Sequence, residues 1–498
     1  MVQEQAREQR GERASVVIVG TGFSGLGMAI RLKQAGIHDF LVLEKSDGLG
    51  GTWRDNTYPG CACDVPSLMY SFSFEQNPAW SRLFAEQHEI SDYLRYCADK
   101  YRIHEHIRYG TEFTGAEFDE DSATWRISTA DGTEYVARAL VSGVGALHIP
   151  SYPEITGLDS FQGEVFHSAQ WNHDYDLTGK RVAVIGTGAS AIQFVPRIAE
   201  QVERLHLFQR TPPWIQPKPD RAVPERIRRW FRRVPGLQRL ARAGVYWLLE
   251  ARFLAVFSQR LRPWSERLSK QYLRSVVKDP ELRAALTPDY AIGCKRILLS
   301  SDYYPALNRD NVDLVTSGVQ EVRERSVVTG DGAEHPVDAI VFGTGFHVTD
   351  AFDHLDIVGR EGRKLQDAWR DGMEAYLGIT VSGFPNLFFL LGPNTGLGHN
   401  SVVFMIESQI NYVLSCLRPI CRDAIDHLDV RQQVQDDFNR EIQGKLTGEV
   451  WSQGGCRSWY LDENGINRTV WPGGTWRYWL RTRKADPADY EIVARGRR

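Results

Sequence analysis

The sequence of 498 residues has few cysteines, no strong charge of one sign and no long apolar run. Its seven cysteines are scattered and odd in number, so they predict neither a disulfide framework nor, without further Cys or His at ligand spacing, a metal site. Reduced cysteines are typical of the cytoplasm, where we therefore expect this protein. The formal net charge of −4 gives no general attraction for nucleic acid.

No segment predicts export or a membrane span. Residues 1–13 are polar and charged and lack the apolar core of a signal peptide. The apolar stretch 243–258 contains Glu250 and Arg252 and is too short to cross a bilayer. With the arginine-rich segment 221–242 before it, it could form a basic helix that touches a membrane surface. We favour the alternative, a helical insertion with solvated arginines over a buried apolar stripe, so membrane contact is not expected.

Two glycine motifs are present, each directly after a short apolar run. They are Gly20, Gly22 and Gly25 after residues 15–19, and Gly186, Gly188 and Ala191 after residues 181–185. In a strand–turn–helix unit such glycines allow a tight turn and a close approach of the backbone to a pyrophosphate, which binds at the helix N-terminus. The sequence therefore predicts two dinucleotide sites.

The residue that would contact the ribose differs between the two motifs. Glu44 and Arg210 each lie 24 residues after the first glycine of their motif. A carboxylate accepts hydrogen bonds from a ribose diol, whereas an arginine suits a 2′-phosphate. We therefore expect FAD at the first motif and NADPH at the second.

The remaining pattern predicts an α/β fold with two Rossmann-like dinucleotide-binding domains and an inserted helical subdomain. Apolar runs at residues 16–19, 40–43, 139–145, 337–345 and 386–392 predict strands, and residues 26–34 and 405–417 have helical periodicity. The expected segments are 1–145 and 346–498 for the FAD domain with a C-terminal lobe, 146–216 and 295–345 for the NADPH domain, and 217–294 for the insertion.

Two longer motifs add specificity. One runs Phe161-x-Gly163-x-x-x-His167-x-x-x-Trp171, and the other runs Gly50-Gly51-x-Trp53-x-x-x-x-Tyr58-Pro59-Gly60-x-x-x-Asp64. With the paired glycine motifs they resemble the type I Baeyer–Villiger monooxygenases, class B flavoproteins that use NADPH, tightly bound FAD and O2. The resemblance covers nearly the whole chain. It departs from the family pattern at Asn172, where the family has Pro or Asp.

The resemblance implies conversion of a ketone to an ester or lactone through a C4a-peroxyflavin and a Criegee intermediate. It implies cofactor binding by Gly20, Gly22, Gly25, Glu44, Gly51, Thr52, Trp53, Asp64, Gly186, Thr187, Gly188, Ala191, Gln193, Arg210, Thr211, Lys295 and Trp459. The partners would be a small ketone and O2, and the apolar insertion suggests a lipophilic ketone. We expect a monomer or a small homo-oligomer.

Arg296 matches the active-site arginine of the family, and Asp64 the carboxylate that pairs with it. A guanidinium keeps its proton near neutral pH, so it can stabilise an anionic peroxide and then the oxyanion of the adduct. Asp64 would orient it. Trp459 resembles a tryptophan that closes over the nicotinamide side, and Lys295 would join Arg210 and Thr211 at the 2′-phosphate.

Other functions remain as alternatives. A flavin monooxygenase that oxygenates sulfur or nitrogen shares both nucleotide folds, but Trp171 and the pair of Asp64 and Arg296 favour ketones. A pyridine-nucleotide disulfide reductase would need a redox cysteine pair, and Cys61-x-Cys63 has the wrong spacing. A non-catalytic NADPH sensor would reduce its flavin slowly and turn over no ketone.

Several residues also have plainer interpretations. Asp64 could cap the turn after Pro59, and Arg296 could be a further phosphate ligand. We expect His167 to be packed and hydrogen-bonded rather than a general base. His399 and Asn400 follow a predicted strand and receive no role from the sequence.

Overall fold

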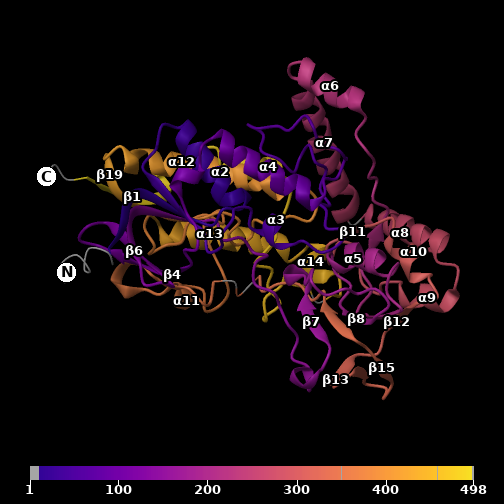
Figure 1. Ribbon diagram of the computed structural model, residues 1–498. Coiled ribbons are helices and arrows are strands. Elements are labelled where there is room, and N and C mark those ends of the chain that lie inside the picture. Colours follow the sequence, from indigo (N-terminus) through magenta and orange to yellow (C-terminus); the bar gives the residue numbers. More distant parts are fainter. Residues whose placement is uncertain (1–9, 259, 349, 351, 457, 496–498) are drawn as a thin grey trace.

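The computed structural model describes residues 10–258, 260–348, 350, 352–456 and 458–495. Figure 1 shows two α/β bodies side by side, with both ends of the chain on the first body and a pair of helices, α6 and α7, projecting where the two bodies meet. The expected fold class is confirmed, because each body contains its own sheet with parallel strands at its centre.

The first body is built on an eight-stranded sheet. In spatial order its strands are β17 (Asp356–Val358), β4 (Phe113–Asp119), β5 (Thr124–Thr129), β6 (Glu134–Ser142), β1 (Arg10–Val19), β2 (Phe40–Leu43) and β3 (Ile107–Arg108), with β18 (Leu387–Phe389) also beside β6. Val16 and Ile18 belong to one core cluster, and Val17 and Val19 to another. The central strand is therefore buried on both faces, as its continuous apolar run predicts.

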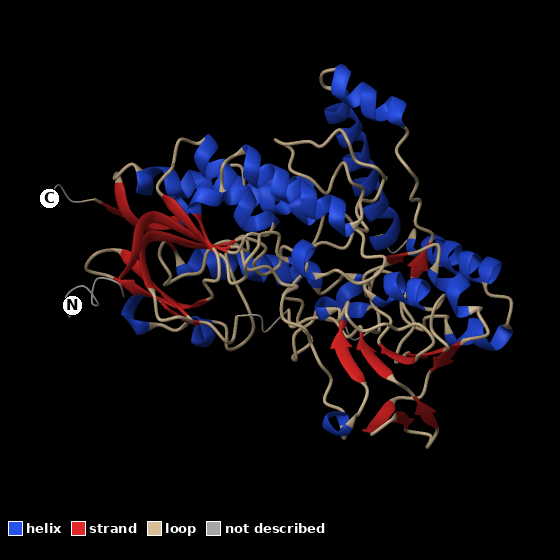
Figure 2. Ribbon diagram, viewed as in Figure 1, coloured by secondary structure: helices blue, strands red, loops and turns tan. Residues whose placement is uncertain are grey.

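Helices cover one face of this sheet, as Figure 2 shows in blue over red. They are α2 (Phe23–Gln34), α4 (Gln87–Lys100) and α12 (Val402–Cys421). α12 extends beyond the predicted 405–417 at both ends, and at its start the side chain of Ser401 caps it by accepting from the Val403 backbone amide at 3.2 Å. The short helix α3 (Thr52–Asp55) follows Gly51, and α11 (Leu365–Ala368) packs near β17.

The second body has a five-stranded parallel sheet. Its order is β12 (Val312–Val315), β9 (Arg204–Phe208), β8 (Arg181–Ile185), β16 (Ala339–Phe342) and β7 (Glu164–His167). Helices α5 (Ala191–Ile198) and α10 (Tyr303–Leu307) pack together beside it. A small antiparallel sheet of β13 (Val319–Arg323), β14 (Ser326–Thr329) and β15 (Glu334–Pro336) lies below it in Figure 1.

The helical insertion contains α6 (Glu225–Arg233), α7 (Leu237–Phe257), α8 (Arg262–Val276) and α9 (Pro280–Ala285). Its two ends are joined by a short parallel pair, β10 (Ile215–Gln216) with β11 (Leu298–Leu299). Within the described residues, none of the helices has the length and apolar character needed to span a bilayer.

The C-terminal lobe adds α13 (Gln432–Leu446), α14 (Val450–Gln453), α15 (Thr475–Arg481) and the antiparallel pair β19 (Ile425–Val430) and β20 (Tyr490–Ala494). The backbone amide of Gly396 donates to Thr469 at 2.8 Å, and that of Trp471 donates to Gly396 at 2.9 Å. These bonds hold the C-terminal chain against the loop after β18.

Candidate functional site

The first glycine loop follows β1 and is shaped by two close approaches. A Cβ on Gly25 would lie 1.8 Å from the Gly20 carbonyl oxygen, so packing of helix on strand requires glycine there. At Gly22, in contrast, a Cβ would meet only the Gly51 Cα, at 4.0 Å. The protein itself therefore leaves room at Gly22, and the space fits a pyrophosphate at the N-terminus of α2.

The segment with Gly51, Thr52 and Trp53 lies directly against this loop. A Cβ on Gly51 would be 3.2 Å from the Gly22 Cα, and Thr52 opens helix α3. Trp53 is buried, and its indole N–H donates to the Tyr70 hydroxyl at 3.0 Å. The structure thus brings together the two segments that we expected to bind FAD, in which Gly22 and Gly51 are 29 residues apart.

Glu44, at the end of β2, is buried and already well bonded. One carboxylate oxygen accepts from the Thr21 amide at 3.0 Å and the Thr21 hydroxyl at 2.5 Å. The other accepts from the Ser46 amide at 3.0 Å and from Arg54 at 3.2 Å. These donors fix the carboxylate beside the glycine loop. A ribose hydroxyl that binds Glu44 would share or replace the bond from the Thr21 hydroxyl, which can rotate away.

The second glycine loop follows β8 and has the same design. A Cβ on Gly186 would lie 2.5 Å from the Gly343 carbonyl oxygen, whereas a Cβ on Gly188 would have that oxygen as its nearest neighbour, at 3.8 Å. Ala191 opens α5 and is fully buried. The Thr187 hydroxyl donates to the Thr211 carbonyl at 3.4 Å, which connects the loop to the end of the neighbouring strand.

Arg210 and Lys295 meet at that strand end. Arg210 is exposed just after β9. Burial and the positive charge of Arg210 lower the pKa of Lys295. Asp289 opposes this shift only in part, so the two cations together form a site for a doubly charged anion. Such a donor set would suit the 2′-phosphate of NADPH, and Thr211 lies beside it in sequence.

Gln193 is held inside the protein. Its side-chain oxygen accepts from the Tyr58 hydroxyl at 3.0 Å and the Ala62 amide at 3.2 Å, and its nitrogen donates to the Ala62 carbonyl at 2.9 Å. Gln193 therefore connects α5 of the second body to the segment that precedes Asp64. Its expected contact with NADPH stays a prediction.

Asp64 and Arg296 form an ion pair across 232 residues of sequence. The Arg296 Nη2 donates to the Asp64 Oδ1 at 2.6 Å, and their side chains are 35% and 21% exposed. The charge of Asp64 raises the pKa of Arg296 above its ordinary value, against the effect of burial. The guanidinium is thus permanently charged, fixed on one side by the carboxylate and still partly open to a ligand.

Tyr460 is a neighbour of this pair that the sequence did not indicate. Its ring is almost fully buried, and burial raises the pKa of its hydroxyl to about 12 although Arg296 opposes the shift. Among the described residues this hydroxyl has no hydrogen-bond partner. Trp459, which we expected to close over the nicotinamide, is 46% exposed, with its ring 4.3 Å from that of Tyr460.

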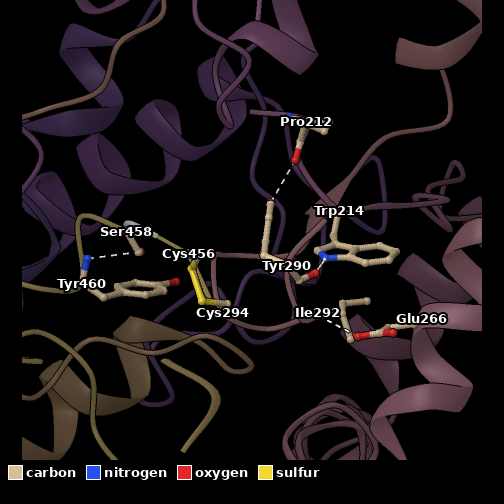
Figure 3. The surroundings of a disulfide bond; sticks show 9 residues. All are labelled: Pro212, Trp214, Glu266, Tyr290, Ile292, Cys294, Cys456, Ser458 and Tyr460. Carbon is tan, nitrogen blue, oxygen red and sulfur yellow. Dashed lines mark hydrogen bonds between the residues drawn. A yellow bond between two sulfur atoms is a disulfide. The ribbon is translucent and has the colours of Figure 1, made fainter. Parts of the chain in front are cut away.

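The structure contains a disulfide that the scattered cysteines of the sequence did not indicate. Cys294 and Cys456 are bonded, 162 residues apart in sequence (Figure 3). The bond connects the residue just before Lys295 and Arg296 to the segment that carries Tyr460. The other five cysteines are free, so the chain has one crosslink and not a framework.

Hydrogen bonds fix the rest of this segment, as the dashed lines of Figure 3 show. The Tyr290 hydroxyl donates to the Pro212 carbonyl at 3.0 Å, and the Trp214 indole donates to the Tyr290 carbonyl at 2.9 Å. The Ile292 amide donates to Glu266 at 3.1 Å. These contacts hold the chain before Lys295 next to the chain after Arg210.

His399 and Asn400, which had no predicted role, bind a buried carboxylate of the insertion. The Asn400 side chain donates to Glu250 at 2.7 Å, and the His399 Nε2 lies 3.3 Å from the same oxygen. Thr475 adds its hydroxyl at 2.6 Å. His167 is fully buried, accepts from the Ala169 amide at 3.1 Å, and has a pKa lowered to about 4 by burial, in agreement with a packing role.

Cys61 and Cys63 are buried free thiols. Burial raises the pKa of Cys61 to about 11 and raises that of Cys63 further. Redox-active cysteines instead have lowered pKa values and an accessible thiolate. Within the part of the chain that the structure describes, no group of three or more His, Cys, Asp or Glu side chains is arranged to hold a metal ion.

Comparison with known proteins places this geometry among flavin-dependent oxygenases. The model of a family described as pyridine nucleotide-disulphide oxidoreductase matches residues 17–237. A protein of Pseudomonas aeruginosa named Baeyer-Villiger monooxygenase is 55% identical over 96% of this chain and 91% of its own length. One of Streptomyces coelicolor with the same name is 49% identical over 98% of this chain and 94% of its own.

Solved structures agree. A steroid monooxygenase bound to NADP superposes with a TM-score of 0.87 at 32% identity, covering 97% of this chain and all of that one. A cyclohexanone monooxygenase from Rhodococcus bound to NADP+ gives a TM-score of 0.86 at 28% identity, covering 97% of this chain and 99% of that one.

Proposed function

Because this chain belongs to the Baeyer–Villiger monooxygenase family, we propose that Arg296 and Asp64 form the catalytic pair with which it converts ketones to esters or lactones. The predicted family, enzyme class and cofactors are confirmed: it is an NADPH-dependent, FAD-containing monooxygenase. When bound, the reduced flavin supplies the activated oxygen. The assignment of residues to each step is our proposal.

The FAD site is formed by Gly20, Gly22 and Gly25 around the pyrophosphate, with Glu44 at the ribose and Trp53 near the flavin. The room above Gly22 and the fixed carboxylate of Glu44 fit this group. Gly51 and Thr52 would bind from the opposite side of the loop, since Gly51 lies against Gly22.

The NADPH site is formed by Gly186, Thr187, Gly188 and Ala191 at the pyrophosphate. Arg210, Thr211 and Lys295 take the 2′-phosphate, because Asp289 compensates the charge of Lys295 only in part and the two adjacent cations need a further anion. The disulfide beside Lys295 fixes the backbone at this point of the site.

The single observation that carries the catalytic assignment is the 2.6 Å ion pair between Asp64 and Arg296. Asp64 contacts one guanidinium nitrogen, which leaves other N–H groups to donate to negative oxygen in the transition state. The raised pKa keeps Arg296 charged at every working pH. Tyr460 stays neutral beside Arg296, and its buried ring would help to exclude water from the guanidinium.

Arg296→Ala tests the assignment. Ester formation should fall by at least about 100-fold, since a fixed cation at the developing oxyanion is worth that much. NADPH oxidation should continue and the oxygen should appear as hydrogen peroxide. Arg181→Ala is the matched control, because it removes a similarly short arginine–aspartate pair, 2.7 Å to Asp338, from the far end of β8.

Ester formation by Arg296→Ala at the parent rate would remove the catalytic role. Asp64→Asn keeps the shape of the side chain and removes its charge, so we expect a smaller loss, about tenfold to 100-fold. Sulfide oxidation, the activity of the alternative class, should be less sensitive to Arg296, because soft nucleophiles do not need an anionic oxidant. Product analysis with a ketone and a sulfide separates the two.

We also keep the cytoplasm as the proposed location, with a monomer or small homo-oligomer as the working form. The disulfide between Cys294 and Cys456 makes this testable, because disulfides are rare in that compartment. Thiol blocking in intact cells followed by peptide mass spectrometry should find both cysteines bonded if the crosslink persists there. Light scattering of the purified enzyme gives the oligomeric state.

A further inference from the structure

Helix α7 buries several polar side chains and exposes several apolar ones. The side chains of Gln238, Arg242 and Glu250 are each less than 10% exposed. Leu240 and Leu248, on the opposite side, are 71% and 67% exposed. The sequence predicted a buried apolar stripe, but the buried side of α7 is polar over much of its length and apolar near its end, at Val256 and Phe257. A surface helix with an apolar outer face indicates a partner for that face.

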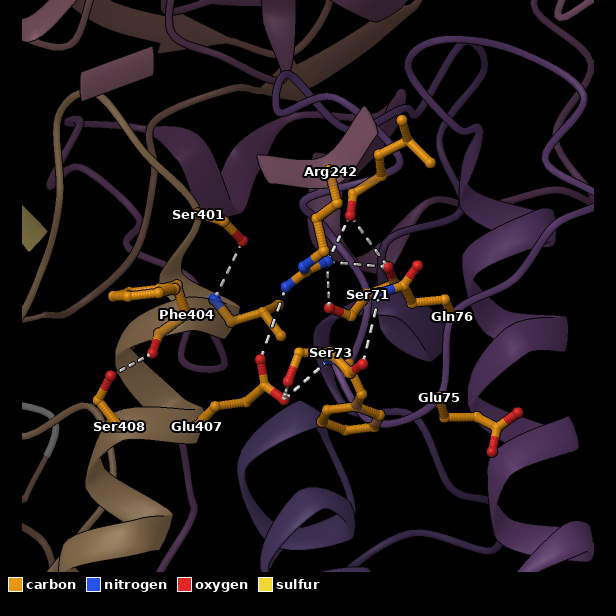
Figure 4. Close-up of polar contacts among 12 residues, drawn as sticks. Ser71, Ser73, Glu75, Gln76, Arg242, Ser401, Phe404, Glu407 and Ser408 are labelled. Atoms are coloured by element: carbon orange, nitrogen blue, oxygen red, sulfur yellow. Dashed lines mark hydrogen bonds and ion pairs between the residues drawn. The ribbon is translucent and has the colours of Figure 1, made fainter. Parts of the chain in front are cut away.

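Buried ionic contacts fix this orientation, as Figure 4 shows. The Arg242 guanidinium donates to the Ser71 carbonyl at 3.1 Å and lies 3.6 Å from Glu407 of α12. Glu407 in turn accepts from the Ser73 amide at 2.8 Å and the Ser73 hydroxyl at 2.7 Å. Gln238 donates to the Asn77 carbonyl at 2.7 Å.

Buried hydrogen bonds also hold the C-terminal half of α7. Glu250 accepts from Asn400 and Thr475, and the Tyr246 hydroxyl lies 3.0 Å from the Thr475 hydroxyl. A rotation of α7 that buried its leucines would expose apolar surface elsewhere and would leave buried charged groups without their partners. The outward position of the apolar side chains is therefore a fixed property of the fold.

Exposed apolar side chains occur on three consecutive helices of the insertion and in the turn between two of them, and we call this set the outer apolar face. It consists of Trp230 of α6, Leu240, Trp247, Leu248 and Leu254 of α7, Leu261 just before α8, and Trp264 and Leu268 of α8. Each of these side chains is more than 40% exposed. Tryptophan and leucine on a surface are typical of contact with the boundary between lipid headgroups and acyl chains.

Positive charge surrounds this face. Residues 221–274 contain 14 arginines and lysines against three acidic residues, although the whole chain has a net charge of −4. One of the three acidic residues, Glu250, is buried. The exposed basic residues on the three helices and the turns beside them are Arg226, Arg229, Arg232, Arg233, Arg239, Arg260, Arg267 and Arg274. Figure 1 shows α6 and the adjoining end of α7 projecting from the body. The arginines of α6 therefore lie where an approaching surface would contact the protein.

We infer that the outer apolar face docks on an anionic lipid surface. Its tryptophans and leucines would enter the headgroup region while the arginines contact lipid phosphates. A second copy related by a two-fold axis fits less well, because it would place arginine-rich helices against each other. The enzyme would lie on the membrane and not span it, and this inference is independent of the catalytic assignment.

Sedimentation of the flavin-loaded enzyme with vesicles tests the inference. We expect binding to vesicles of phosphatidylcholine with phosphatidylglycerol, much weaker binding to pure phosphatidylcholine, and loss of binding at high salt. Trp247→Ser with Leu248→Ser should weaken binding by at least about tenfold. The control is Ile492→Ser with Val493→Ser on β20, which removes two residues that are each 44% exposed and should leave binding unchanged.

A second variant distinguishes a loss of lipid binding from a loss of folding. Arg229→Gln with Arg232→Gln changes exposed side chains of α6, and each lost charge should weaken binding about fivefold. Flavin content and melting temperature report the fold of every variant. The inference would be overturned if the wild-type enzyme did not bind anionic vesicles, or if all variants bound them equally. It would also be overturned if the enzyme did not bind vesicles but formed a dimer that Trp247→Ser with Leu248→Ser abolishes.

Discussion

The two glycine loops share one local design but have opposite surroundings. At the first, the third motif residue must be glycine, and the expected ribose ligand, Glu44, is buried among four donors. At the second, the third residue is Ala191, and the expected phosphate ligand, Arg210, is exposed. A cofactor that is retained needs a closed site, whereas NADPH must bind and leave as NADP+. The same glycine turn can therefore bind a retained cofactor at one loop and an exchanging cofactor at the other, because the residues around the two loops differ.

The largest expected effect is at the third position of the motif. Gly25→Ala places a methyl group 1.8 Å from the Gly20 oxygen, so the first body should lose about 3 kcal/mol or more of stability and most of its flavin. The reciprocal change, Ala191→Gly, should cost only about 1 kcal/mol. Thermal unfolding and flavin content measure both. A stable, flavin-loaded Gly25→Ala enzyme would show that the two loops are packed alike.

Substitution of the second glycine of each motif tests cofactor binding without a change in folding. Gly22→Ala and Gly188→Ala both have room for the methyl group in the protein alone, so both should fold. Gly22→Ala should bind FAD at least about 100-fold more weakly, equivalent to about 2.7 kcal/mol, because the methyl group enters the space of the pyrophosphate. Gly188→Ala should keep its flavin and instead raise the KM for NADPH. If Gly188→Ala lost flavin, the assignment of cofactors to loops would be wrong.

Arg210 tests the difference in ligand charge. Arg210→Ala should raise the KM for NADPH about tenfold to 100-fold, the effect of losing a charge-assisted bond, with little change for NADH. Arg204→Ala is the control, because Arg204 is on β9, the strand that precedes Arg210, but pairs with Asp313 at the surface. Equal effects on NADPH and NADH would exclude a role at the 2′-phosphate.

The smallest expected effect is a pH dependence confined to the second site. Burial and Arg210 lower the pKa of Lys295, so Lys295 loses its charge at a lower pH than an ordinary lysine. Affinity for NADPH should be greatest below that pKa and should fall severalfold as the pH rises through it. Lys295→Arg should remove the dependence, since arginine stays charged. An unchanged profile in that variant would place the titrating group elsewhere.

Local parts of the fold could be predicted from sequence. The run 40–43 is the strand β2, and the glycine motifs lie at strand ends as their spacing requires. The pairing of Asp64 with Arg296 followed from family resemblance alone, because nothing local connects residues 232 positions apart. The disulfide between Cys294 and Cys456 and the position of Tyr460 beside Arg296 were missed for the same reason.

The sequence by itself determined the two strand–turn–helix units and the opposite charges of Glu44 and Arg210, because hydrophobic period, glycine position and side-chain charge are properties of neighbouring residues. The tertiary structure decided which face of α7 is buried. Its helical pattern permits either orientation, and only the distant partners Ser71, Glu407 and Thr475 draw its polar side inward. Contacts between segments hundreds of residues apart depend on how whole domains pack, and no local pattern encodes them.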